Sequence, residues 1–236
     1  MDKGGLVEKY GEAWERSVVS MPVSCRNEQM PTNPLLLAIP ESFVEANIKI
    51  LFFGQETNDW EGVFPHSEGI HHLVVTYTKI YLNGLYFRYD GQFWNGISKL
   101  KQKFEVHLAH TGTTVSFLWN NLVKIGKCEN IGLPSEELLQ WQDHWFNIIR
   151  EGVLFLRPDA TIFFIGPNYN RFIRRIFDDV NFERINERNE RQLARVRSVH
   201  LPIKTIRTYH LNYLWRNGFY RYLDEIANEM TGRGDR

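Results

Sequence analysis

The chain has 236 residues, of which 43% are apolar and 24% charged, and its basic and acidic side chains balance to a formal net charge of zero. This composition is typical of one soluble globular domain and argues against a protein that binds nucleic acid through its overall charge. No apolar run approaches the roughly 18 residues of a transmembrane helix, and residues 1–16 lack the apolar core of a signal peptide, so we expect a cytoplasmic protein.

The residues that could bind metals are few and badly spaced. Cys25 and Cys128 are the only cysteines, which argues against a disulfide framework, a zinc ribbon and a four-cysteine iron–sulfur cluster. The histidine pairs His71-His72 and His107/His110 have no carboxylate or cysteine at a metal-ligand spacing. The sequence therefore predicts no metal and no other cofactor.

Apolar runs and helical periodicity alternate along the chain. Strand-like runs cover residues 48–53, 114–119, 160–165 and 203–208. Helical patterns cover residues 6–20, 71–87, 93–104, 135–156, 166–177 and 212–230, with Ser135 as an N-cap. Helices that connect parallel strands make right-handed crossovers. We therefore predict a single α/β domain, a three-layer αβα sandwich with a central, mostly parallel four-stranded sheet and a helical extension over about residues 1–45.

The stretch IKILFFGQETNDW, residues 48–60, organises the rest of the prediction. We expect its strand to stop at Gly54 and to give way to a polar loop that runs to about Gly69. The other three strands also end in polar residues, and the ends of parallel strands meet at one edge of a sheet. This edge would gather five side chains around one crevice: Gln55, Glu56, Asn121, Asn168 and His210. No GxGxxG or GxxxxGK[ST] is present, which argues against a Rossmann dinucleotide site and a P-loop.

Three of these strand ends occur in a distinctive order. Gly54-Gln55-Glu56-Thr57-Asn58 follows the first strand, Asn121 ends the second, and His210-Leu211-Asn212-Tyr213-Leu214 follows the last. This order resembles the uracil-DNA glycosylase superfamily, whose motifs are Gly-Gln-Asp-Pro-Tyr, a strand-end asparagine and His-Pro-Ser-Pro-Leu. The motif prolines are replaced here, and the chain lacks the cysteines of the iron–sulfur branch. The resemblance spans residues 48–216 and implies a divergent, cluster-free member.

The resemblance implies a role for each strand-end residue in hydrolysis of an N-glycosidic bond. Glu56 stands in place of the family's aspartate and would position water and stabilise an electron-poor sugar. His210 would donate to O2 of the departing base, and Gln55 would offer its backbone N–H. Asn121 would read the N3–H and O4 edge of uracil, with Asn120 as its neighbouring alternative.

Apolar side chains complete this prediction. Trp60 and Phe64 are the candidates for stacking on a base that has left the duplex, and Leu214 and Trp215 are candidates for a wedge that enters the duplex. Each of the four could instead belong to the hydrophobic core. The polar candidates also have structural alternatives: a helix cap or ion pair for Glu56, strand-end bonding for an asparagine, and a carbonyl partner for a buried histidine.

The predicted function is thus a monomeric DNA glycosylase that removes uracil or a related damaged base, with DNA as its partner. One alternative is a non-catalytic module that binds a nucleobase or nucleic acid. A second is a hydrolase or sugar-nucleotide enzyme that shares only the architecture. Residues 171–216 contain ten arginines and one lysine against five acidic residues, which could form a basic face or a solvated segment of mixed charge.

Overall fold

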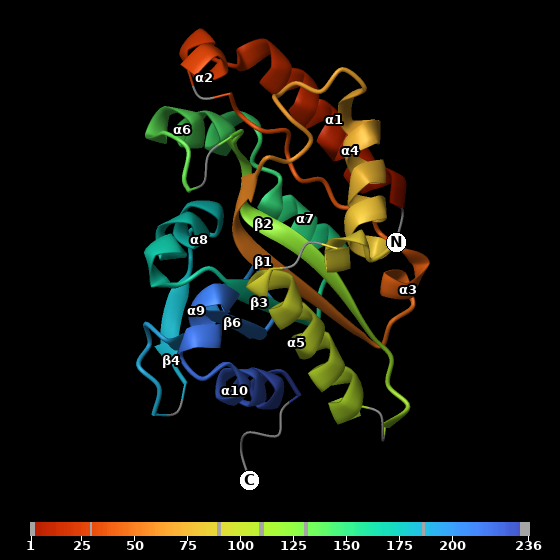
Figure 1. Cartoon of the computed structure of the whole chain (residues 1–236), viewed down its shortest axis with the longest axis vertical. Helices are drawn as coiled ribbons and strands as arrows, with labels where there is room; N and C mark the ends of the chain where they lie inside the picture. Colours follow the sequence, from red (N-terminus) through yellow and green to blue (C-terminus); the bar gives the residue numbers. More distant parts are fainter. Residues whose placement is uncertain are drawn as a thin grey trace.

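The centre of the molecule is one mixed, mostly parallel six-stranded sheet, seen in the computed structural model with the strand order β2-β1-β3-β6-β5-β4 (Figure 1). The structure describes residues 3–28, 30–88, 91–108, 111–129, 132–185 and 187–231. The strands are β1 (Ile48–Asn58), β2 (Val115–Lys127), β3 (Ala160–Phe164), β4 (Asn181–Arg184), β5 (Leu193–Arg197) and β6 (Lys204–Thr208). The pairs β2–β1, β1–β3 and β3–β6 are parallel, whereas β6–β5 and β5–β4 are antiparallel.

Helices flank this sheet. In chain order they are α1 (Lys3–Ser20), α2 (Val23–Glu28), α3 (Glu41–Val44), α4 (Gly69–Tyr77), α5 (Gln92–Leu108), α6 (Glu136–Trp145), α7 (Ile149–Leu156), α8 (Asn170–Ile176), α9 (Leu211–Arg216) and α10 (Phe219–Thr231). A π-helix, η1 (Thr78–Leu82), and two 3-10 helices, η2 (Leu85–Arg88) and η4 (Pro167–Tyr169), complete them. Helices α5, α6 and α8 contact β2, and α10 contacts β6. No helix within the described ranges combines the length and apolarity needed to cross a membrane.

The prediction of four strands is wrong in number, although all four predicted strands are present. The two further strands, β4 and β5, lie in the charged segment for which we expected a helix or a loop. Phe182, Ala194 and Val196 lie on one face of this hairpin and are buried, while Arg195 on the other face pairs with Glu229. The alternation of apolar and charged residues is therefore a strand signal, but it is too short to stand out within the surrounding charges.

The expected break at Gly54 is also wrong, because β1 continues through it to Asn58. Gly54 pairs with Asn121 and Glu56 pairs with Val123, so β2 accompanies β1 well beyond the predicted strand end. The hydroxyl of Thr57 donates to the carbonyl of Val123 at 3.1 Å. The polar residues that follow Gly54 consequently lie on a paired strand instead of a loop.

Three predicted helices are interrupted. The predicted helix 71–87 becomes α4, η1 and η2, and it leaves the helical conformation before η2 at Gly84, whose φ is +75°. The predicted helix 135–156 becomes α6 and α7, which are separated at Phe146, a buried residue with non-helical backbone angles. Its start is confirmed, since Ser135 caps α6 by accepting the backbone N–H of Leu138 at 3.2 Å. The last predicted helix is divided into α9 and α10 before Gly218, whose φ of +90° is incompatible with a continuous α-helix.

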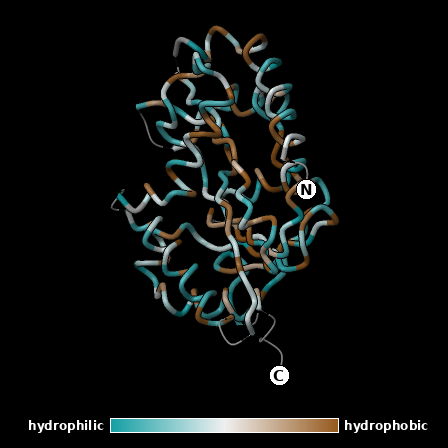
Figure 2. Tube along the Cα trace, turned by 90° about the vertical axis from the view of Figure 1, so that its right-hand side faces the viewer, coloured by the Kyte–Doolittle hydropathy of each residue, from teal (hydrophilic) through white to brown (hydrophobic). Residues whose placement is uncertain are grey.

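Large aromatic side chains fill the core along the neighbouring strands β1 and β3. Phe52 and Phe53 of β1 are fully buried against Phe163 and Phe164 of β3, and the rings of Phe53 and Phe163 stack at 4.9 Å. In Figure 2 the central segments are traced largely in the apolar colour, whereas the outer helices alternate between apolar and hydrophilic. The sheet is thus a rigid base for side chains at its edge.

We predict that Gly126→Ala destabilises the protein by about 3 kcal/mol or more. A Cβ at this position of β2 would lie 1.7 Å from the backbone oxygen of Thr57, so the β1–β2 pairing would have to open. Urea unfolding of the variant and of wild type measures the change in the free energy of unfolding. Gly152→Ala on α7 is the matched control, because nothing lies within 4 Å of its Cβ and alanine favours the helix by up to about 1 kcal/mol. Equal unfolding midpoints for the two variants would contradict the prediction.

Candidate functional site

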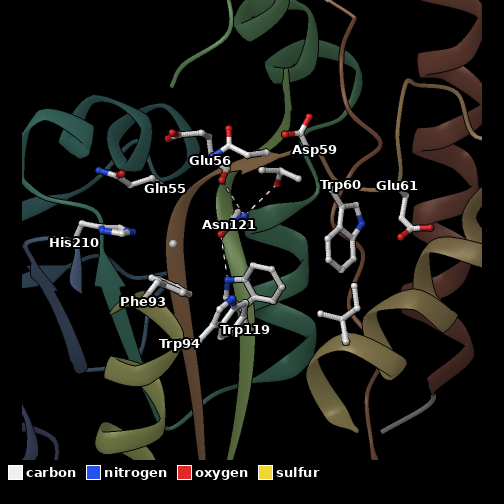
Figure 3. A pocket seen from close by; sticks show the side chains of 14 residues that line it. Gln55, Glu56, Asp59, Trp60, Glu61, Phe93, Trp94, Trp119, Asn121 and His210 are labelled. Carbon is white, nitrogen blue, oxygen red and sulfur yellow. Dashed lines mark hydrogen bonds between the residues drawn. The ribbon is translucent and has the colours of Figure 1, made fainter. Parts of the chain in front are cut away.

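A cavity of about 430 Å³ opens beside the paired extensions of β1 and β2 (Figure 3). It is lined by Gly54, Gln55, Glu56, Thr57, Asn58, Asp59, Trp60, Glu61, Ile80, Phe93, Trp94, Trp119, Asn121 and His210. Four of the five residues expected around one crevice therefore line one cavity, although they come from β1, β2 and the start of α9. The fifth, Asn168, is exposed and lines a neighbouring cavity of about 220 Å³.

The amide of Asn121 is held in one orientation. Its Nδ2 donates to the carbonyl of Glu56 and to the hydroxyl of Thr57, both at 3.2 Å, and its Oδ1 accepts the indole N–H of Trp119 at 3.2 Å. Both amide hydrogens are thus engaged, and one lone pair of Oδ1 remains. Asn121 can accept a hydrogen bond from a ligand, but it cannot also donate one without losing a bond to β1.

Asn120, the alternative to Asn121, does not line the cavity. Its Oδ1 accepts the backbone N–H of Asn121 at 2.9 Å and the amine of Lys124. The amine of Lys124 also donates to the carbonyl of Leu35, and burial lowers the pKa of Lys124 to about 7. This buried network is structural and supports β2 from behind.

The carboxylate of Glu56 accepts a hydrogen bond from the hydroxyl of Tyr169 in η4. Burial and the neighbouring Glu56 raise the pKa of Tyr169 well above its usual value, so this hydroxyl stays protonated and donates. No lysine or arginine in the described ranges forms an ion pair with Glu56. One carboxylate oxygen is therefore positioned by Tyr169, and the other is available to water or a ligand.

His210 is a neutral hydrogen-bond donor. Its Nδ1 accepts the backbone N–H of Asn212 at 3.3 Å and so caps α9, which leaves the proton of the neutral ring on Nε2. Burial lowers the pKa of His210 to about 4. The ring stacks on Phe93 with a centroid distance of 5.3 Å. The expected alternative, a histidine bonded to a carbonyl, does not describe this contact.

Gln55 joins two strand ends. Its Nε2 donates to the carbonyl of Ile165 after β3 at 2.8 Å. This bond fixes the side chain between the main cavity and the neighbouring one, both of which Gln55 lines. Its side chain therefore has a positioning role in the structure, and the predicted role of its backbone N–H stays a prediction.

Aromatic rings form much of the cavity wall. Trp94 meets Trp119 edge-on at 4.7 Å, and Trp60 meets Trp119 edge-on at 5.9 Å. Trp60 is only 8% exposed, and its indole N–H has no hydrogen-bond partner among the described residues. Sequence reasoning selected Trp60 but missed Phe93, Trp94 and Trp119, because no local signal separates them from core aromatics.

Phe64 does not reach the cavity, contrary to the predicted stacking role. It is 1% exposed and packs edge-on against Trp14 at 4.9 Å and Trp141 at 5.9 Å. The chain leaves the cavity wall after Glu61 and turns towards α1 and α6, which carries Phe64 into the core.

The structure also places the predicted wedge residues outside the cavity. Leu214 is 1% exposed and belongs to the hydrophobic core, so it cannot enter a duplex from this position. The ring of Trp215 stacks on Phe219 at 3.9 Å, and its indole N–H donates to the carbonyl of Gln92 at 2.8 Å. Both side chains fasten α9 to its surroundings.

Two further carboxylates line the cavity where the backbone leaves β1. Asp59 and Glu61 have positive φ angles of 45° and 55°, an uncommon conformation for residues other than glycine. Asp59 accepts the backbone N–H of Glu129, and the carboxylate of Glu61 contacts His72. These contacts hold the turn, and neither acid was selected from the sequence.

Glu61, His66 and His72 have ligand atoms within 4.8 Å of one another, a donor set that zinc takes. However, the rings of His66 and His72 stack in parallel at 4.0 Å, so their nitrogens are not directed at one point. In this arrangement the group acts as a support for the turn at Glu61. His71, from the predicted histidine pair, is exposed, and His110 lies outside the described residues.

Part of the positive charge in residues 171–216 is paired with acids from other segments, through Arg171, Arg175, Arg188 and Arg195. Arg175 contacts Glu136 and Asp143, and Arg188 forms a two-pronged bond with Glu225 at 2.8 Å. The charges of these arginines are therefore offset locally by the neighbouring carboxylates.

No known protein family matches the chain, and a comparison with curated proteins found no match. The function must therefore be inferred from the chemistry of the cavity.

We predict that the imidazole of His210 stays neutral from pH 8 to pH 5. Its native pKa of about 4 lies below the value of about 6.5 in the unfolded chain. The native state is therefore destabilised as the pH falls from 6.5 towards 4, where only the unfolded chain gains the proton. An NMR titration of the His210 ring protons measures this pKa. Their resonances are assigned by their absence from the spectrum of the His210→Gln variant. A titration midpoint near pH 6.5 would contradict the prediction that His210 has a lowered pKa.

We also predict that Gly54→Ala displaces the amide of Asn121. The added Cβ would lie 2.5 Å from Oδ1 of Asn121 and 3.4 Å from the ring of Phe93. The indole N–H resonance of Trp119 should shift, because Trp119 donates to that oxygen. Gly11→Ala on α1, whose nearest neighbour would be at 3.7 Å, is the control and should leave this resonance in place.

Proposed function

We propose that this protein is a DNA glycosylase that hydrolyses the N-glycosidic bond of uracil or a related damaged base, on a three-layer αβα fold of the uracil-DNA glycosylase type. The supporting observation is that one aromatic-lined cavity contains the carboxylate of Glu56, the neutral imidazole of His210 and the oriented amide of Asn121. These groups match the needs of the reaction: an anion beside the sugar, a donor beside the departing base and a reader of the base edge.

The cavity suits a nucleobase that has left its stack. Its volume lies in the range of about 300–1,000 Å³ that is usual for small-molecule sites, and flat rings dominate one side of it. A base removed from a duplex loses its stacking partners, which aromatic side chains replace. Among the predicted stacking residues, Trp60 is the one that lines this space.

Glu56 is the residue that we assign to the water. In this mechanism the oxygen of water bonds to C1′ as the bond from C1′ to the base nitrogen breaks, and the electron pair of that bond leaves with the base. One oxygen of Glu56 orients the water and accepts its proton, while the negative charge stabilises the electron-poor sugar. Tyr169 is a positioning residue, because it binds the other oxygen of Glu56.

His210 and Asn121 act on the base. The N–H at Nε2 of the neutral His210 ring donates to the base oxygen on which negative charge develops, without transferring its proton. The free lone pair of Asn121 Oδ1 accepts the N3–H of uracil, while Trp119 and the β1 backbone prevent the amide from turning. A water molecule is the only co-reactant, so the mechanism requires no cofactor.

A binding module without turnover is the second candidate. Two features favour it. The hydroxyl of Tyr169 already binds one oxygen of Glu56, and three arginines that could bind phosphates, Arg175, Arg188 and Arg195, are in ion pairs. Such a module would bind a base or a single strand in the same cavity and release it unchanged.

The test is base release from single-stranded and G·U-mismatched oligonucleotides that contain uracil. Wild type should release free uracil, and Glu56→Gln and His210→Ala should each lower the rate by about tenfold or more. Glu15→Gln, which alters an exposed acid on α1, is the charge-matched control and should retain the wild-type rate.

Each alternative result has a distinct meaning. Normal release by Glu56→Gln would remove Glu56 from the mechanism. Binding of the oligonucleotide without release of any damaged base would favour the binding module. Neither binding nor release would reject both functions.

A further inference from the structure

The cavity is unusually acidic for a site that receives part of a polyanion. Three carboxylate residues line it, Glu56, Asp59 and Glu61, whereas no lysine or arginine of the described residues does. The remaining titratable group, His210, is neutral at physiological pH. A ligand in this space therefore meets a negative potential that nothing in the lining balances.

Aromatic residues of the cavity wall lie across the cavity from two of these carboxyl groups. In Figure 3 the carboxyl groups of Glu56 and Asp59 lie towards one side of the space, and the rings of Phe93, Trp94 and Trp119 lie towards the other. The face of an aromatic ring attracts cations, and tryptophan does so most strongly. Carboxylates and indole rings around one cavity are thus complementary to a flat cation.

We propose that the cavity selects a cationic N-alkylated purine, of which 7-methylguanine is the representative, over neutral bases. Methylation at N7 gives the purine a positive charge while it sits on its sugar. Its N1–H and amino group are donors suited to the carboxylates and to the free lone pair of Asn121 Oδ1. Its O6 is an acceptor suited to the N–H of His210, and the unpaired indole N–H of Trp60 is a further buried donor of the same wall.

The cleavage step of this inference rests on the proposed function, whereas the binding step does not. Water bonds to C1′, the bond from C1′ to N9 breaks, and its electron pair neutralises the positive purine. The proton of the water goes to Glu56. The base leaves without negative charge, so the acidic lining does not oppose its departure, as it would oppose an anionic uracil.

The first experiment compares 7-methylguanosine with guanosine, which differs only by the methyl group and its charge. Quenching of tryptophan fluorescence measures both affinities. Wild type should bind 7-methylguanosine about tenfold or more tightly than guanosine. Equal affinities would overturn the inference.

Two substitutions test the source of the preference. Asp59→Asn keeps an oxygen that can accept the N–H of Glu129, and asparagine tolerates the positive φ at this position. The double variant Asp59→Asn/Glu61→Gln should bring the ratio of the affinities for 7-methylguanosine and guanosine towards one. The control Glu15→Gln should leave this ratio unchanged. An unchanged ratio in a folded double variant would refute the role of the acidic lining.

The second experiment separates this inference from the proposed function. Base release is measured from duplexes that contain a single 7-methylguanine or a single uracil, and the cationic base should be released faster. Release of uracil alone, with equal nucleoside affinities, would reject the cation preference and retain the glycosylase. Tight binding of 7-methylguanosine without release of either base would reject the glycosylase and retain the cation site.

Discussion

The close pairing of β1 and β2 beyond Gly54 is the constraint on which the rest of the site depends. Gly126 lacks a side chain where the carbonyl of Thr57 approaches, and this allows two strands to remain paired far past the main body of the sheet. The pairing brings Asn121 beside the backbone of Glu56, to which its amide is bonded. Asn121 and Glu56 therefore occupy neighbouring strands whose separation is set by backbone hydrogen bonds, which vary much less than loop conformations.

A second level of support surrounds this pair. Tyr169 after β3 holds the carboxylate of Glu56, and Gln55 bonds to the carbonyl that follows β3. Trp119 holds the amide of Asn121, and the backbone of α9 holds the ring of His210. Each polar side chain thus enters the cavity with at least one hydrogen bond already made and with one group still available. Such preorganisation lowers the free energy needed to orient the site when a ligand binds.

The cavity wall carries acidic side chains, whereas the C-terminal segment of residues 171–216 carries an excess of arginines. Several arginines of the C-terminal segment pair with acids of α6 and α10, whereas the acids of the cavity wall have hydroxyl, amide or imidazole partners. Because no arginine or lysine in the described part of the chain lines the cavity, the local potential there stays negative although the formal net charge of the chain is zero. Selection of a ligand by charge is consequently a property of the cavity and not of the whole surface.

The sequence by itself determined the four parallel strands and the chain order of their polar ends, because buried strands are long apolar runs and parallel strands end at one edge. It therefore predicted that Glu56, Asn121 and His210 would meet. It did not show that β1 and β2 continue past Gly54, since pairing between strands distant in the sequence decides this. It also did not show that a charged segment forms β4 and β5, since their apolar alternation is too short to stand out among the charges. The tertiary structure alone decided which aromatic residues face the cavity. Phe64 and Trp94 have similar local signals, and only the packing of distant helices sends the first into the core and the second to the cavity wall.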